Sequence, residues 1–112
     1  HPPVIIYHAA DRMVESNNSK GKLLGVFDTS KYEQKSLPLK KGDRVFFYTD
    51  GLTEIINKQY DMLGNEKFID IIQESSDKNL SSTLDRIFAE VNRFRGGMPI
   101  EDDIVLIGCE IL

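Results

Sequence analysis

The apolar positions in the first half of the chain fall into short, strand-like runs. Residues 44–49 contain four consecutive apolar or aromatic side chains, at positions 45–48, so the pattern predicts a strand that is buried on both faces. Residues 4–7 and residues 13–15 are shorter runs, and each predicts a strand. Residues 23–27 predict a further strand, and residues 32–39 predict an edge strand because a proline near its end argues against a central position.

Helical spacing of the apolar positions takes over in the second half of the chain. Residues 52–57 predict a short helix. Two longer helices are predicted, one capped by Asn65 and one that is capped by Ser82 and ended by Gly96. Residues 104–111 predict a final strand. This order, with hairpin-like links between the early strands, favours one α+β domain with a mostly antiparallel sheet and helices packed on it.

The composition narrows the class of protein but says little about its function. The chain has 112 residues, of which 40% are hydrophobic and 29% are charged, and these values fit one globular domain. Its net charge of −4 and the lack of a basic cluster argue against nucleic acid as a partner. No apolar run approaches the roughly 20 residues that span a bilayer, so no membrane contact is expected from this segment.

The single cysteine, Cys109, lies in the predicted last strand. In such an apolar run it is expected to be a buried structural thiol, since no histidine neighbours it in the sequence. One cysteine cannot form an internal disulfide, which favours a cytoplasmic location.

Acidic residues stand at two predicted strand junctions. Asp50 ends the strong strand, and Asp102 and Asp103 precede the last one. If these strands are neighbours, the carboxylates converge on one rim of the sheet, and oxygen-only ligands select hard cations such as Mg²⁺ or Mn²⁺. Two other interpretations remain open at this point. Asp50 with its following glycine is also a common turn dipeptide, and residues 101–103 also suit a solvated acidic loop.

A wider set of motifs resembles a known family. In chain order these motifs are His1-Pro2-Pro3, Leu24-Gly25, Gly42-Asp43, the run YTDGLTE at residues 48–54, and Asp102-Asp103. Together they resemble the second half of a PPM phosphatase domain, in the protein phosphatase type 2C superfamily, and more narrowly its bacterial SpoIIE/RsbU-like branch. The resemblance covers essentially the whole chain. Its most specific part is the YTDGLTE run with the Asp-Asp pair downstream.

The resemblance implies a fold and a reaction. Its fold is an αββα sandwich with a two-metal centre, Mn²⁺ or Mg²⁺, at one end of the paired sheets. The metals activate a water that attacks the phosphorus of a phosphoserine or phosphothreonine. Residues 1–112 would be the C-terminal portion of such a domain, with the N-terminal portion absent from this sequence.

The resemblance also assigns roles to individual residues. Asp50 and Asp102 match the family's metal-binding aspartates and are the expected catalytic residues. Asp103 is expected to bind a metal weakly or to orient the other ligands. Glu54 is expected to belong to a structural or regulatory helix. The remaining metal-binding aspartates of the family would precede His1, so the segment by itself is expected to be a poor phosphatase or none at all.

The implied partner is a phosphorylated protein, in this branch usually an anti-anti-sigma-like regulator. Strand edges without a neighbour could also pair with another chain and give a homo-oligomer. A rival interpretation is a non-catalytic signalling or interaction module on the same scaffold. A weaker one treats Asp50, Asp102 and Asp103 as turn residues of a structural domain.

Overall fold

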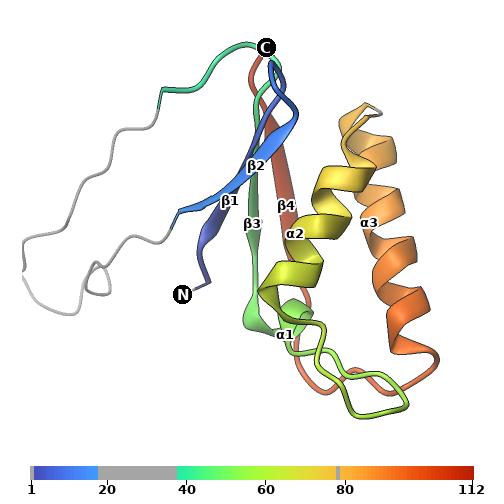
Figure 1. The fold of residues 1–112 in the computed structure, drawn as a ribbon. Helices are drawn as coiled ribbons and strands as arrows, with labels where there is room; N and C mark the ends of the chain where they lie inside the picture. Colours follow the sequence, from blue (N-terminus) through green and yellow to red (C-terminus); the bar gives the residue numbers. More distant parts are fainter. Residues whose placement is uncertain (1, 18–37, 78) are drawn as a thin grey trace, which may run out of the picture.

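The described part of the chain forms one antiparallel sheet that is covered on one face by helices (Figure 1). A computed structural model describes residues 2–17, 38–77 and 79–112. The elements in chain order are β1 (Val4–His8), β2 (Met13–Asn17), β3 (Arg44–Tyr48), α1 (Asp50–Thr53), α2 (Gly64–Ser75), α3 (Leu80–Arg95) and β4 (Leu106–Glu110). The sheet has the order β2-β1-β3-β4, and every neighbouring pair is antiparallel. The predicted α+β fold is therefore confirmed.

The predicted strands were placed with mixed accuracy. The strand predicted at residues 4–7 is β1, and the strong one predicted at residues 44–49 is β3. β2 extends to Asn17, two residues beyond the strand predicted at residues 13–15. The strand predicted at residues 23–27 lies outside the described residues, as does most of the edge strand predicted at residues 32–39.

The hydrophobic core lies between the sheet and the two long helices. Phe46 of β3 stands at its centre, opposite Ile5 of β1 and Gly108 of β4. Tyr48 packs edge-on against Phe68 of α2, with 4.8 Å between the ring centroids. The helices add residues at helical spacing, as predicted from the sequence: Phe68, Ile71 and Ile72 from α2, and Ile87 and Val91 from α3.

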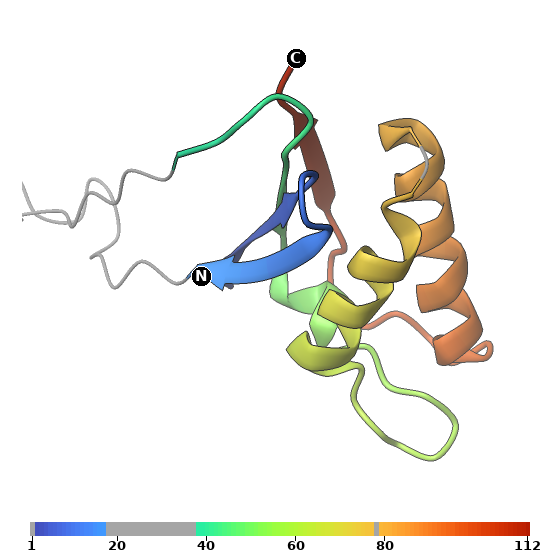
Figure 2. The same cartoon turned by 45° about the horizontal axis from the view of Figure 1, so that its top comes forward.

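No described helix or strand covers the opposite face of the sheet (Figure 2). Phe47 of β3 points to this face and is 46% exposed, and its cross-strand partner Ile107 is 53% exposed. The prediction that this strand is buried on both faces is thus wrong for the described residues, because the helices pack on one side only. Cys109, expected to be buried, is exposed for the same reason.

The helix ends also differ from the sequence-based predictions. α2 begins at Gly64, so Asn65 lies inside the helix and does not cap it. The cap of α3 is Asn79, whose side chain accepts a hydrogen bond from the backbone N–H of Ser82. Gly96 ends α3 in a left-handed conformation, as predicted.

The short helix was also misplaced. It was expected at residues 52–57, but α1 spans Asp50–Thr53, and Ile56 instead forms an isolated β-bridge with Met62. Within the described ranges, none of the helices has the length and apolar character that a membrane span requires.

A buried arginine ties the helices to the sheet at the start of β3. Arg44 donates to Glu110 of β4 at 2.8 Å and to the hydroxyl of Thr83 in α3 at 2.9 Å. That hydroxyl in turn donates to the backbone carbonyl of Ser75 at the end of α2. The network fixes one end of the layered structure, and the acidic residues lie at the other end of β3.

Candidate functional site

The end of β3 is joined to the segment that precedes β4 by one threonine side chain. The hydroxyl of Thr49 donates to the backbone carbonyl of Asp103 at 2.9 Å and accepts from the backbone N–H of Val105 at 3.0 Å. The backbone N–H of Thr49 also donates to the carbonyl of Val105 at 3.1 Å. These three hydrogen bonds extend the contact between β3 and β4 beyond the last ladder pair and fix the backbone on both sides of the rim.

Gly51 allows the same two segments to approach without a side chain between them. A Cβ atom on Gly51 would lie 3.3 Å from the Cβ of Asp102 and 3.1 Å from the carbonyl carbon of Asp103, and it would overlap the carbonyl oxygen. Only glycine fits at this position without a shift of the backbone. The residue before it is Asp50, so the backbone brings Asp50 and Asp102 to one rim of the sheet, as the sequence predicted.

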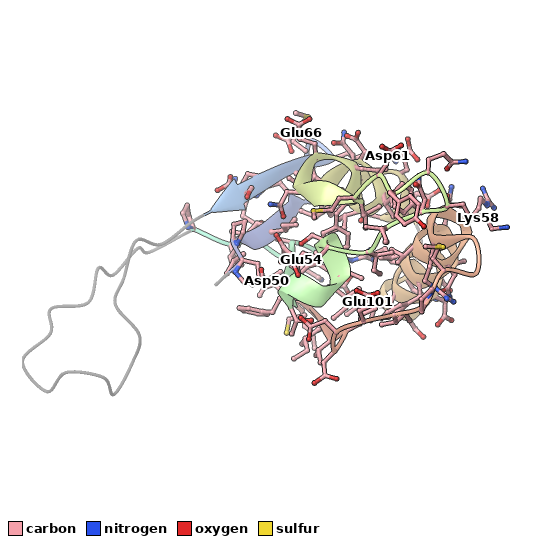
Figure 3. All side chains as sticks on the ribbon, turned by 90° about the horizontal axis from the view of Figure 1, so that it is seen from below. Asp50, Glu54, Lys58, Asp61, Glu66 and Glu101 are labelled. Atoms are coloured by element: carbon pink, nitrogen blue, oxygen red, sulfur yellow. The ribbon has the colours of Figure 1, made fainter. Side chains whose placement is uncertain are left out.

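The three aspartates are exposed at this rim. Asp50 is the first residue of the single-turn helix α1. A carboxylate oxygen of Asp102 accepts from the backbone N–H of Asp103 at 2.8 Å, which restrains its orientation. Figure 3 looks onto this end of the sheet and shows Asp50 and Glu54 close together on one side of α1, with Glu101 on the other side.

Tyr48, the last residue of β3, lies next to the rim. It is buried, and its hydroxyl donates to the side-chain oxygen of Asn65 at 2.9 Å. Burial raises the pKa of Tyr48 to about 12, and the negative charge of Asp50 contributes to the rise. The phenol therefore stays neutral at physiological pH. It serves as a packing and hydrogen-bonding group next to the rim.

The rim carries side chains of a type that can hold a metal ion. Its donors are carboxylate oxygens, which suit Mg²⁺ or Mn²⁺. Within residues 2–17, 38–77 and 79–112, however, no three His, Cys, Asp or Glu residues are grouped so that they could hold a metal ion. A hard cation of this kind takes about six oxygen ligands. The donor type therefore fits the metal, and the number of protein donors falls short.

Sequence reasoning missed two residues that build the rim. The hydroxyl of Thr49 links both segments, and Gly51 permits their close approach. Both lie within the YTDGLTE run, but nothing in the pattern says which distant segment they contact. It also missed a pocket of about 110 Å³ beside Asp102, which Gly51, Glu54 and Glu101 help to line.

The whole sequence matches one protein family. Residues 1–112 match the family described as stage II sporulation protein E (SpoIIE). No curated protein sequence is significantly similar to the chain.

Solved structures with a similar fold include a PP2C domain and a phosphatase domain. The chain is similar to the SiaA-PP2C domain of Pseudomonas aeruginosa, with a TM-score of 0.79, 19% identity, and coverage of 98% of this chain and 44% of that one. It is similar to a structure of the RsbU and RsbW domains of a Mycobacterium tuberculosis protein, with a TM-score of 0.70, 23% identity, and coverage of 98% and 30%. It is also similar to the phosphatase domain of the cell fate determinant SpoIIE from Bacillus subtilis, with a TM-score of 0.59, 21% identity, and coverage of 98% and 48%.

These likenesses define the fold, and the chain spans less than half of the length of each of these three structures. The helix-covered antiparallel sheet matches PP2C-type domains over nearly its full length. The match to the family covers every residue. The chain therefore belongs to the SpoIIE family, and its fold is similar to part of a PP2C-type domain.

Proposed function

We propose that residues 1–112 are the C-terminal portion of the catalytic domain of a metal-dependent protein serine/threonine phosphatase. The observation that carries the proposal is the close approach of Gly51 to Asp102 and Asp103, which brings Asp50 and Asp102 to one exposed rim. Two carboxylates on adjacent, hydrogen-bonded segments can supply part of the oxygen ligands of a metal site. The family membership supports the same reaction class.

In this proposal Asp50 and Asp102 would hold Mn²⁺ or Mg²⁺, and Asp103 would bind weakly or orient the neighbouring ligand. When bound, such metals supply an activated water and neutralise charge on the phosphoryl oxygens. Thr49 and Gly51 hold the two ligand segments together, and Tyr48 stays neutral near Asp50. The remaining ligands would come from the N-terminal portion of the domain.

The exposed face of the sheet supports this division of the domain. Phe47 and Ile107 form an apolar pair on that face. In a two-sheet sandwich such residues pack against the second sheet, which the N-terminal portion would supply. The edges of the described sheet are β2 and β4, and a homo-oligomer that pairs these strands would satisfy their free backbone groups.

The proposed substrate is a phosphorylated protein, an anti-anti-sigma-like regulator, and the proposed location is the cytoplasm. The structural relatives include a SiaA-PP2C domain, RsbU and RsbW domains, and the phosphatase domain of SpoIIE, and the phosphatase domain among them supports a phosphorylated substrate. The rim is exposed and open, so a phosphorylated segment of a folded partner could reach it.

A second candidate is a non-catalytic signalling or interaction module on the same scaffold. Its support is that no group of three metal-ligating residues occurs in the part of the chain that the structure describes. The two candidates differ in one respect that can be measured: only the enzyme needs the carboxylates of Asp50 and Asp102 for turnover.

The test uses the intact protein with Mn²⁺ and measures hydrolysis of p-nitrophenyl phosphate and of a phosphoserine peptide. Asp50→Asn and Asp102→Asn should each lower kcat/KM by about 100-fold or more, since even outer contacts of metal ligands cost 10–100-fold when removed. Asp61→Asn is the matched control, because Asp61 is exposed and lies on the far side of the loop after α1 (Figure 3). Activity that is absent with every metal, or unchanged in both aspartate variants, would favour the non-catalytic module.

A further inference from the structure

A small pocket adjoins the candidate metal rim and shares Asp102 with it. Its volume is about 110 Å³, and it lies between the residues that follow α1 and the segment that precedes β4. Four aliphatic residues form its apolar part: Ile55, Ile56, Pro99 and Ile100. Two carboxylate side chains, Glu54 and Glu101, complete the lining together with Gly51 and Asp102.

The two glutamates have no partner within the described part of the chain. Glu54 and Glu101 are both exposed, and neither side chain takes part in a hydrogen bond or an ion pair there. Lys58, a lysine of the same loop, packs its aliphatic chain against Gly96 at the end of α3. Its Cε atom lies 3.7 Å from the position that a Cβ atom on Gly96 would take. Figure 3 shows Lys58 directed away from Glu101. The pocket therefore combines an aliphatic lining with unneutralised negative charge.

This combination defines the chemistry of an occupant. A lysine or arginine side chain has an apolar stem that covers aliphatic surface and a cationic head that remains near water. The stem fits against residues such as Ile55 and Ile100, and the head would meet the carboxylates of Glu54 and Glu101. A purely aliphatic side chain would leave the carboxylates unpaired, and an acidic one would be repelled.

The location of the pocket says where the occupant comes from. Gly51 and Asp102 belong both to the pocket and to the proposed metal rim. When a substrate segment places its phosphorylated residue at the rim, a side chain that neighbours this residue in the substrate can therefore reach the pocket.

We propose that this pocket binds a lysine or arginine side chain of the protein substrate that lies close to the phosphorylated serine or threonine. Glu101 and Glu54 are then specificity-determining residues that select substrates with a basic residue beside the phosphorylated one. This inference rests on the proposed phosphatase function for its position next to the reacting phosphate, and its binding component is measured separately.

The experiment uses the intact protein and pairs of phosphoserine peptides that differ at one position. One peptide carries lysine and the other norleucine, which keeps the aliphatic stem and lacks the charge, and each flanking position is tested in turn. At the best position kcat/KM for the lysine peptide should exceed that for the norleucine peptide by about three- to tenfold, the range expected for one or two exposed ion pairs.

The preference should depend on the glutamates. Glu101→Gln and Glu54→Gln should each lower the ratio of the two kcat/KM values toward one, and the double variant should abolish it. Glu66→Gln is the matched control, since Glu66 is an exposed glutamate of the same charge that does not line the pocket, and it should leave the ratio unchanged. Hydrolysis of both peptides at equal kcat/KM, or a preference that persists in the double variant, overturns the inference and leaves the phosphatase assignment intact.

Peptide binding without turnover separates this inference from the proposed function. Fluorescence anisotropy of the same labelled peptides, recorded with excess chelator, should give tighter binding of the lysine peptide by a similar factor, lost in the double glutamate variant. That result without any hydrolysis would retain the pocket and reject the phosphatase. Equal binding of both peptides rejects the pocket whatever the activity. A Glu101→Gln variant that changes the Mn²⁺ dependence, but not the peptide preference, assigns the pocket to a metal ion and also overturns the inference.

Discussion

Gly51 and Asp103 touch through their backbones at the rim of the sheet, with no room for a side chain on Gly51. The contact joins the helix after β3 to the segment before β4, two stretches that are about fifty residues apart in sequence. Because Asp50 and Asp102 are the immediate neighbours of these two residues, the geometry of the proposed ligand pair depends on this contact. Its disruption should affect metal binding more than it affects the remainder of the fold.

Gly51→Ala tests that dependence. The added methyl overlaps the carbonyl oxygen of Asp103, so one of the two segments must move, and overpacking of this kind costs about 1–3 kcal/mol in the free energy of unfolding. The affinity of the intact protein for Mn²⁺, measured by calorimetry, should fall together with the activity.

Gly108→Ala is the control for the same substitution. Its added methyl would lie 3.1 Å from a side-chain carbon of Leu80, between the sheet and α3 and away from the rim. This variant should lose some stability in chemical denaturation and keep the Mn²⁺ affinity of the parent. Equal loss of Mn²⁺ affinity in both variants would show that the Gly51 contact has no special role.

Thr49→Val tests the hydrogen bonds at the rim. Valine keeps the shape of threonine but removes the hydroxyl that bonds both Asp103 and Val105. The variant should lose about 1–2 kcal/mol in the free energy of unfolding, and its Mn²⁺ affinity should fall. Thr49→Ser keeps the hydroxyl and should retain most of the Mn²⁺ affinity. A valine variant that binds Mn²⁺ as tightly as the parent would show that the rim is held by other contacts.

The sheet was more predictable from the sequence than the helix caps were. β3 was recognised because its apolar residues are consecutive, and α3 because its apolar residues recur at helical spacing. Asn65 and Ser82 were both assigned as caps, since either residue type satisfies a free backbone N–H. The true cap of α3 is Asn79, three residues earlier, and its identity depends on where the chain turns after α2.

The candidate site shows the same division between local and non-local information. The positions of Asp50 and Asp102 at strand junctions were evident from the sequence, and their convergence required only that β3 and β4 be neighbours. The roles of Thr49 and Gly51 depend on how closely two distant segments approach, which the pattern of residue types does not contain. The exposure of Cys109 was mispredicted for a related reason: an apolar strand does not reveal which of its faces is covered.

A histidine at the far end of the sheet predicts a pH dependence of stability. His8 of β1 contacts Glu15 of β2 at 2.8 Å and buried Asp43 at 3.5 Å. Its hydrogen bond to Glu15, with a smaller contribution from Asp43, raises the pKa of His8 above its ordinary value of 6.5. A raised pKa in the folded state means that the protonated histidine stabilises the fold.

The sign of the effect follows from that shift. The stabilisation by His8 is fully present below pH 6.5 and is lost as the pH rises through the higher pKa of the folded state. The contribution of the Asp43 carboxyl to stability has the opposite pH dependence and is lost at acid pH. Backbone N–H groups of Lys40 and Ala9 lower its pKa below 3.8, so its contribution is present above that value and is lost as the pH falls through the pKa of the folded state.

His8→Gln should therefore flatten the fall in stability above pH 6.5, and it should weaken the acid limb only slightly, because the backbone N–H groups of Lys40 and Ala9 lower the pKa of Asp43 more than His8 does. Urea denaturation of the parent and of the variant at a series of pH values measures both limbs. A parent whose stability does not fall across the neutral range, or a variant with the same fall as the parent, would contradict the assignment to His8.

Phe47→Ala tests whether the rest of the domain covers the outer face of the sheet. Phe47 is 46% exposed in this chain, and Phe88 on the outer side of α3 is 38% exposed, so the two phenylalanines are matched in residue type and exposure. If a second sheet packs on the outer face of the intact protein, Phe47→Ala removes a buried ring and costs about 3–5 kcal/mol, the usual loss for a core phenylalanine. Phe88→Ala removes a ring that stays exposed and should cost about 1 kcal/mol or less. Denaturation of the intact variants measures the difference, and similar losses at both positions would mean that the outer face stays open to solvent or to a separate partner.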